Sequence, residues 1–260
     1  MQVYAVKAAR EGKQHTNWLA PDARYERGIE SFLGRLLDRE QSAGFVDSFA
    51  AFARRTALLG ALNSLTQVTL KTAMPGVPDF YQGTEFWDLS LVDPDNRRPV
   101  DFAVHCAALA STSDTLDWPA LAATWHDGRI KLALTRRLLA LRGQLADLFA
   151  RGSYRPLEVT GPHSNEIIAF ARISGRDAVI VVTGRLFKRA TSAGRQWPRG
   201  QAWNAAVSVE DFSEIAGVIA AGQGVGGPRL VASELFGMLP VAVLRAKFAP
   251  SLRYAVTLAR

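Results

Sequence analysis

The sequence predicts an α+β protein with two domains: the C-terminal part of a (β/α)8 barrel, mostly helical, followed by an antiparallel β-sandwich. Two observations lead to this fold class. Apolar residues recur at helical spacing through the first 150 residues, which contain only one good candidate for a barrel strand. After Gly152 the pattern changes to short runs rich in β-branched residues. We therefore expect a barrel part with a helical insertion over 1–150 and a β domain over 151–260.

Three helical stretches are expected in the first domain. Apolar residues after Pro21 predict a helix over about 22–39, with Pro21 in its first turn. The same spacing continues from Phe45 to Ala73, as one long helix or as two helices with a break near Gly60 to Ser64. A third helix is predicted from Ile130 to Phe149. Since the apolar positions share one side of each helix, we interpret nearly all of them as scaffold.

The candidate barrel strand lies between the second and third helices. Pro75-Gly76 ends a helix, Val77 to Tyr81 is a short extended run, and a polar loop continues to about Pro99. A helix, a short buried strand, a loop and another helix follow the βα order of a barrel. A complete barrel needs eight strands and about 250 residues. We therefore expect only the end of a barrel, with its last strand near 77–81.

The second domain is predicted to be an all-β module of about 110 residues, arranged as an antiparallel sandwich. A hairpin connection, Ser174-Gly175-Arg176, joins two of its expected strands. A glycine-rich loop is expected over Ala221 to Pro228. The expected strands are Tyr154 to Thr160, Glu166 to Ile173, Asp177 to Thr183, Gln201 to Val207, Arg229 to Leu235 and Val241 to Leu244.

Composition excludes several classes of function. The net charge is +7, but the arginines are spread along the chain and often lie beside acids, so we expect no nucleic-acid partner. The longest apolar runs fall short of the roughly 18 residues that a membrane span needs, and the N-terminus does not resemble a secretion signal. The single cysteine, Cys106, excludes an intrachain disulfide, and its apolar surroundings predict a small buried side chain. We expect a soluble, cytoplasmic protein.

The segment from Pro75 to Asp101 is the main candidate for a functional site, because it mixes aromatic and polar side chains. Aromatic rings stack on the C–H faces of a pyranose, while carboxylates, amides and guanidinium groups bind its hydroxyls. An alternative is a loop whose acids pair with Arg97 and Arg98 to hold its own shape. The candidate sugar-binding residues are Tyr81, Gln82, Glu85, Trp87, Asp93, Asp95, Asn96, Arg97 and Arg98.

Two other chemistries are weaker candidates in the same segment. Asp93-Pro-Asp95-Asn96 has some character of a calcium loop but lacks its glycine and its distant glutamate, so we predict no metal and no cofactor. A retaining glycosidase would need two carboxylates about 5 Å apart. Glu85 with Asp93 or Asp95 could be such a pair, and the sequence does not place them.

A second polar cluster lies near the N-terminus. Lys7, Arg10 and Glu11 share a helical face by their spacing, and His15 and Trp18 follow in a loop. A lone histidine in such a position more often caps or packs than catalyses. Trp18 suits a sugar platform and a hydrophobic lid on the next helix equally well.

The segment PGVPDFYQGTE resembles the end of the eighth barrel strand in the α-amylase superfamily, where a PG-x-P-x-x-Y-x-G-x-E pattern is common. The extension WDLSLVDPDNRRPVDF resembles malto-oligosyltrehalose synthases, as does KAAREGKQHTNWLAPDARYE upstream. RIKLALTRRLLALRGQLADLFARGSYRPLEV is similar to the last barrel helix of that family running into its C-terminal β domain. The resemblance is carried by 7–26 and 75–101 and is weaker over 128–185.

The resemblance implies an intramolecular transglucosylation, in which the α-1,4 bond at the reducing end of a malto-oligosaccharide becomes an α,α-1,1 bond. The family's nucleophile, general acid/base and stabilising aspartate lie on earlier strands, so no acid of this chain is assigned a catalytic role. The implied partners are the malto-oligosaccharide substrate and the missing N-terminal part of the same enzyme. The isolated chain is then expected to be inactive.

The same resemblance assigns substrate contacts. Tyr81, Gln82 and Glu85 would line the floor of the site, and the loop from Asp93 to Arg98 would hold the reducing-end glucose. The facing wall would be formed by Lys7, Arg10, His15 and Trp18. The competing interpretation is a non-catalytic α-glucan-binding or scaffolding module.

Overall fold

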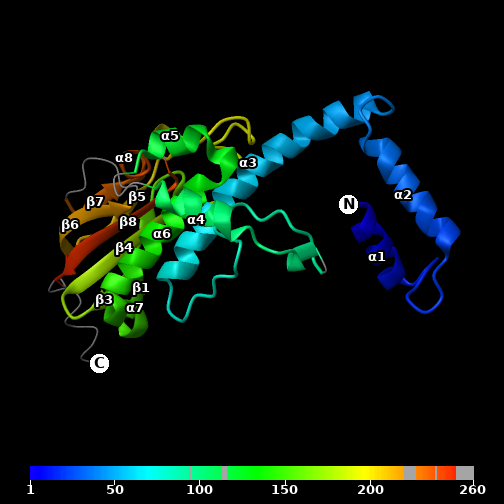
Figure 1. Cartoon of the computed structure of the whole chain (residues 1–260). Coiled ribbons are helices and arrows are strands. Elements are labelled where there is room, and N and C mark those ends of the chain that lie inside the picture. Colours follow the sequence, from blue (N-terminus) through cyan, green and yellow to red (C-terminus); the bar gives the residue numbers. More distant parts are fainter. Residues whose placement is uncertain (94, 113–115, 220–226, 238, 250–260) are drawn as a thin grey trace. The chain divides into compact units, whose positions relative to one another are not determined.

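A computed structural model describes residues 1–93, 95–112, 116–219, 227–237 and 239–249 of the chain (Figure 1). These residues form two compact units. The first unit contains Met1–Thr56 and Leu89–Pro99, and the second contains Ala57–Asp88 and Val100–Arg260. Each unit is described separately below.

The first unit is helical. It contains α1 (Gln2–Gly12), α2 (Ala23–Leu37), the beginning of α3 (Ala43–Ala73) and the 3-10 turn η1 (Asp95–Arg97). The helix predicted over 22–39 is confirmed. Its N-cap is Asp22, whose carboxylate accepts from the backbone N–H groups of Arg24 and Tyr25. Pro21 therefore precedes the cap instead of occupying the first turn.

Helix α3 passes from the first unit into the second without a break, so the interpretation as one long helix is confirmed. Leu58, Leu62 and Leu65 are buried at helical spacing on both sides of Gly60, and their packing supports helical backbone through that glycine. In the part of the chain that the structure describes, no helix is long and apolar enough to cross a membrane.

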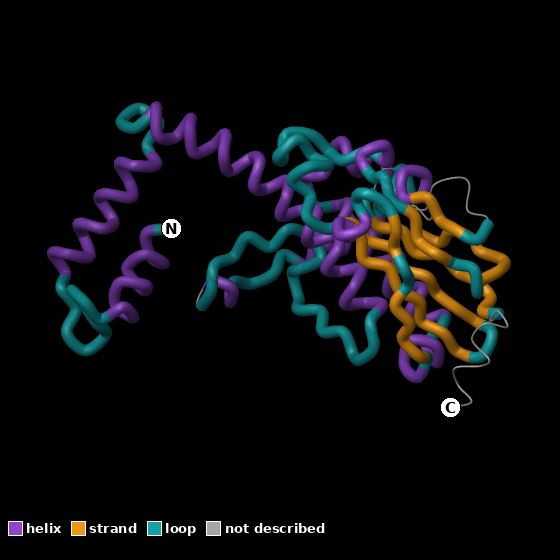
Figure 2. Tube along the Cα trace, turned by 180° about the vertical axis from the view of Figure 1, so that it is seen from behind, coloured by secondary structure: helices purple, strands orange, loops and turns teal. Residues whose placement is uncertain are grey.

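The second unit is built on two antiparallel sheets (Figure 2). The larger has the order β1-β3-β4-β8-β6 and the smaller the order β2-β5-β7. The predicted hairpin is confirmed, since Ser174 pairs with Asp177 and Gly175 turns the chain with a φ of 59°. The strands are β1 (Ser153–Pro156), β2 (Val159–Thr160), β3 (Ile167–Ser174), β4 (Asp177–Gly184), β5 (Ala206–Ser208), β6 (Phe212–Ile219), β7 (Arg229–Val231) and β8 (Val241–Phe248).

Several boundaries differ from the predicted ones. The helix expected from Ile130 to Phe149 is two helices, because the backbone leaves the helical region at Leu145. Strand β6 was not predicted, since its burial does not alternate and its register shifts twice against β8. The glycine-rich loop falls largely outside the described residues. The remaining elements are α4 (Phe102–Ala110), α5 (Trp118–Ala123), η2 (Trp125–Asp127), α6 (Arg129–Gln144), α7 (Ala146–Arg151), η3 (Ser164–Glu166), η4 (Gly200–Ala202) and α8 (Ala232–Leu235).

The inner strands β3, β4 and β8 of the larger sheet are buried on both faces. On one face, Phe170, Val179 and Val181 belong to a cluster with Leu65 of α3 and with residues of α6 and α7. On the other face, Ile180 and Val182 belong to a cluster with residues of the smaller sheet and of α8. This double burial explains the uninterrupted apolar run of β4. The change from helix to strand occurs between α7 and β1, close to the expected boundary near Ala150; a separate domain over 151–260 stays a prediction.

Two sequence predictions differ from the structure in the second unit. The strand expected over Val77 to Tyr81 does not form among the described residues: the segment is neither helix nor strand, and no strand pairs with it. The carbonyls of Gly76 and Asp79 accept side-chain hydrogen bonds from Arg142 and Lys71 instead. The prediction for Cys106 is wrong: its side chain is exposed on α4, because most of that short apolar helix lies at the surface.

The buried guanidinium of Arg172 on β3 joins helix ends to the sheet. It donates to the carbonyl oxygens of Ala73 (3.0 Å), Phe149 (2.9 Å), Gly152 (2.8 Å) and Leu148 (3.3 Å). Ala73 ends α3, Phe149 lies in the last turn of α7 and Gly152 is its C-cap, so these carbonyls carry partial negative charge, whereas the Leu148 carbonyl also accepts the backbone N–H of Gly152. Burial lowers the pKa of Arg172, and the carbonyl dipoles compensate its charge.

We expect Arg172→Met to lower the free energy of unfolding by about 2–4 kcal/mol, because a buried carbonyl without a donor costs about 1–3 kcal/mol. Urea unfolding measures the change as a shift in midpoint at constant slope. Arg176→Met, an exposed arginine four residues away, is the control and is expected to shift the midpoint little. Equal midpoints for the two variants would contradict this role of Arg172.

Candidate functional site

The segment from Pro75 to Asp88 is irregular, and cationic side chains of two helices hold its backbone. Arg142 of α6 donates to the carbonyls of Thr72 and Gly76, at 2.7 Å in each case. Lys71 of α3 donates to the Asp79 carbonyl at 2.9 Å, and its ammonium lies 4.1 Å from the Phe80 ring centre. Lys131 of α6 donates to the Phe86 carbonyl at 3.0 Å. The backbone is therefore fixed without a strand ladder.

A tight turn in this segment exposes the side chains of Tyr81 and Gln82. The Thr84 hydroxyl donates to the Tyr81 carbonyl at 2.6 Å and closes the turn. Gly83 has a φ of 86°, and a Cβ there would lie 3.0 Å from Val100, so the turn needs glycine. Beside it lies a cavity of about 230 Å³ between α3 and α6, which Tyr81 and Glu85 help to line.

Glu85 and Trp87 both have partners within the protein. A Glu85 carboxylate oxygen lies 3.1 Å from His105 Nδ1 on α4. The indole N–H of Trp87 donates to the Trp125 carbonyl at 2.7 Å, and the two rings meet edge to face. Lys131 lies 5.7 Å from the centre of the Trp87 ring. The expected sugar contacts of Glu85 and Trp87 stay predictions, and both side chains also stabilise the segment.

The loop from Leu89 to Pro99, in the first unit, pairs its own charges. Arg97 donates to both Asp93 oxygens, at 2.8 and 2.5 Å. Asp95 pairs with Arg98 and accepts from the Leu91 N–H at 2.7 Å. The self-paired loop that the sequence left open is therefore observed. The exposed Asn96 lies between the two pairs.

The N-terminal cluster is organised around Glu26, which the sequence analysis did not select. Arg10 donates to both Glu26 oxygens, at 2.8 and 2.7 Å, and the buried Thr16 hydroxyl donates at 2.6 Å. The hydrogen bonds from Arg10 and then from Thr16 lower the pKa of Glu26 to about 2. One signal was available in the sequence: Glu26 precedes Ile29 by three positions on the apolar side of its helix.

Lys7, Arg10 and Trp18 of this cluster line a pocket, whereas His15 packs elsewhere. The Arg10 guanidinium carbon lies 5.0 Å from the centre of the Trp18 ring, which is 55% exposed, and His15 packs on Tyr25 at 5.0 Å between ring centres. A cavity of about 410 Å³ in the first unit brings the two predicted polar clusters together. Its lining residues are Val3, Val6, Lys7, Arg10, Trp18, Glu30 and Asp93.

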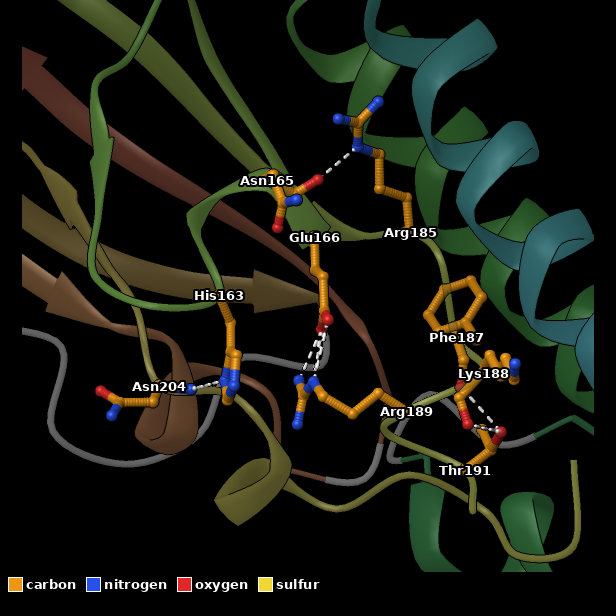
Figure 3. Close-up of polar contacts among 9 residues, drawn as sticks. All are labelled: His163, Asn165, Glu166, Arg185, Phe187, Lys188, Arg189, Thr191 and Asn204. Atoms are coloured by element: carbon orange, nitrogen blue, oxygen red, sulfur yellow. Dashed lines mark hydrogen bonds and ion pairs between the residues drawn. The ribbon is translucent and has the colours of Figure 1, made fainter. Parts of the chain in front are cut away.

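A separate polar network lies beside the sheets of the second unit (Figure 3). Arg189 grips Glu166 through two nitrogens, at 2.8 and 2.5 Å, and lowers its pKa. Arg185 donates to the Asn165 carbonyl at 2.7 Å, and the Asn204 N–H donates to His163 Nδ1 at 2.9 Å. Each of these contacts joins two segments of the chain, so we interpret the network as structural.

The fold and these surfaces define the class of the protein, which is an α+β polypeptide whose helical part exposes aromatic and polar side chains. No family model matches the chain. A Mycobacterium tuberculosis protein named as a maltooligosyl trehalose synthase is 36% identical over 186 residues, which are 70% of this chain and 21% of that protein.

Solved structures of maltooligosyltrehalose synthases are also similar to this chain. The maltooligosyltrehalose synthase from Arthrobacter ramosus matches 94% of this chain with a TM-score of 0.70 and 29% identity, and this chain covers 30% of it. A Sulfolobus tokodaii structure described as a hypothetical maltooligosyl trehalose synthase matches 94% with a TM-score of 0.66 and 27% identity. The chain is homologous to one part of the maltooligosyltrehalose synthases, and it spans about a fifth of the curated relatives' length.

We expect the Glu26 carboxyl to titrate near pH 2, measured by its ¹³C chemical shift. Because the folded pKa lies below the ordinary value of 4.5, Glu26 stabilises the fold fully above about pH 4.5. That contribution is lost as the pH falls towards 2. Arg10→Met should raise the pKa of Glu26. Arg24→Met, at an exposed position of α2, the helix that carries Glu26, should leave that pKa unchanged. If the Glu26 carboxyl of the unaltered protein titrated near pH 4.5, that result would contradict the hydrogen bonds from Arg10 and Thr16.

Proposed function

We propose that the chain works as one part of a maltooligosyltrehalose synthase and contacts the malto-oligosaccharide there. The reaction would convert the reducing-end α-1,4 bond into an α,α-1,1 bond by intramolecular transglucosylation. The observation that carries the proposal is the 36% identity to the Mycobacterium tuberculosis protein, together with structural similarity over 94% of the chain to the Arthrobacter ramosus synthase.

In this proposal the helical part is the end of a (β/α)8 barrel, and the antiparallel sheets are the C-terminal β domain. The position of Val77 to Tyr81 supports the assignment, because this segment connects α3 to the later helices as a last barrel strand would. Its backbone would pair with neighbouring strands supplied by the rest of the synthase.

The reacting carboxylates would come from outside this chain. Glu85 lies beside His105, Asp93 is gripped by Arg97, and Asp95 pairs with Arg98. Each of these carboxylates is already held in place by a basic side chain of this chain. These acids are therefore suited to positioning and to binding hydroxyls.

The pocket around Trp18 is the best candidate for a sugar contact. Its volume of about 410 Å³ falls within the range of small-molecule sites, roughly 300–1,000 Å³. Trp18 offers a partly exposed indole, and Lys7, Glu30 and Asp93 offer donors and acceptors for hydroxyls. The same pocket favours the second candidate function, a non-catalytic α-glucan-binding module.

We expect the purified 260-residue chain to convert no maltopentaose. The assay follows the loss of reducing ends and the appearance of a trehalose terminus, with the Arthrobacter ramosus synthase as positive control. Measured conversion by the chain alone would show that its own carboxylates suffice. It would refute the proposal that the reacting carboxylates come from outside this chain.

We expect Trp18→Ala to weaken maltotriose binding about twofold to thirteenfold, because a stacked aromatic contributes about 0.5–1.5 kcal/mol beyond the area it buries. Isothermal titration calorimetry measures the change. Leu19→Ala, at the fully exposed neighbouring position, is the matched control and should leave the affinity unchanged. If the unaltered chain binds no maltotriose, the stand-alone binding module is excluded.

A further inference from the structure

The first unit has almost no interior of its own. Within Met1–Thr56, a stretch that the structure describes completely, the only buried residues are Thr16 and Glu26. The buried apolar residues of α3 begin at Leu58, in the second unit. A unit of this size normally depends on buried apolar surface for its stability. The large apolar residues of the first unit therefore lie at or near its surface.

Three phenylalanines form a continuous apolar face on the first half of α3. Phe45, Phe49 and Phe52 recur at four- and three-residue spacing, so they share one side of the helix. Their exposed fractions are 42%, 51% and 62%, and the Phe45 and Phe49 rings stack with centres 5.6 Å apart. We call this set the phenylalanine face. Helix α2 of the same unit exposes Phe32 and Leu37 as well.

A face of this kind indicates a partner surface. Isolated apolar side chains are common at protein surfaces, but a row of large aromatics is not. The described residues of the first unit leave this row more than two-fifths exposed. Burial of the three rings would supply the apolar contacts that the unit lacks.

We propose that the phenylalanine face docks against the part of a maltooligosyltrehalose synthase that this chain does not span. The inference rests on the proposed function. It is supported by coverage: the chain matches the Arthrobacter ramosus synthase over 94% of its own length but covers only 30% of that protein. The corresponding helix in the synthase therefore belongs to a much larger protein, and residues outside the matched region are available to cover it. The partner surface would be apolar, with pockets for aromatic rings.

The test mixes the full 260-residue chain with a polypeptide that comprises the remainder of the Arthrobacter ramosus synthase. Native mass spectrometry and sedimentation velocity measure association without any sugar. We expect a one-to-one complex, at least tenfold weaker for Phe49→Asp. Ala51→Asp adds the same charge on another side of the helix and should bind as the unaltered chain does. Hydrogen exchange should slow in α2 and in the first half of α3 on association.

Three results would overturn the proposal: no complex with the remainder, equal affinities for the two variants, or a dimer of the unaltered chain that Phe49→Asp converts to monomer. The last would make a second copy the occupant. Because association is measured without substrate, the proposed function fails separately. A complex that forms through this face but converts no maltopentaose would refute the function and leave the docking surface intact.

Discussion

The second unit depends on the hydrogen bonds that the Arg172 guanidinium donates to backbone carbonyls. A charge on a central strand is costly to bury, and it is tolerated here because α3 and α7 end beside it with carbonyls that lack donors. An arginine suits this position because its planar fork reaches several acceptors at once and stays protonated despite burial. The sheet and the two helix ends are thereby fixed to each other by one side chain.

The hydrogen bonds of Arg172 also help to position the candidate site, because they hold the end of α3. Arg172 binds the carbonyl of Ala73, the last residue of α3, and Arg142 binds the carbonyls of Thr72 and Gly76 on either side of it. The chain therefore leaves the helix in a defined direction. Lys71 and Lys131 then hold two further carbonyls along the segment. Side chains thus replace a strand ladder, and the turn at Gly83 exposes Tyr81 and Gln82 from a backbone that is already ordered.

The sequence predicted those parts of the fold that local chemistry decides. The helix after Asp22 and the hairpin at Gly175 follow from periodicity and turn residues, and helical spacing predicted α3 as either one helix or two. It could not predict what depends on distant partners. Val77 to Tyr81 has strand composition but no neighbouring strand among the described residues, and Cys106 lies on an apolar helix that the fold leaves exposed. Within the site, the Asp–Arg pairs were foreseen as an alternative, whereas Glu26 was missed because its partners Arg10 and Thr16 precede it by 16 and 10 positions.

The proposed function requires the chain to contact a sugar without performing the chemistry, and the contacts of its acids fit that requirement. Acids that act in glycoside chemistry need a tuned proton affinity, which a guanidinium partner opposes by stabilising the anion. Arg10 holds Glu26 through two hydrogen bonds and lowers its pKa, and Arg97 holds Asp93 through two hydrogen bonds as well. A fixed carboxylate still accepts from hydroxyls, and Trp18 beside Arg10 adds an apolar surface. In the proposed function, the motif segments would therefore hold a saccharide, and the proton transfers would fall to other residues of the synthase.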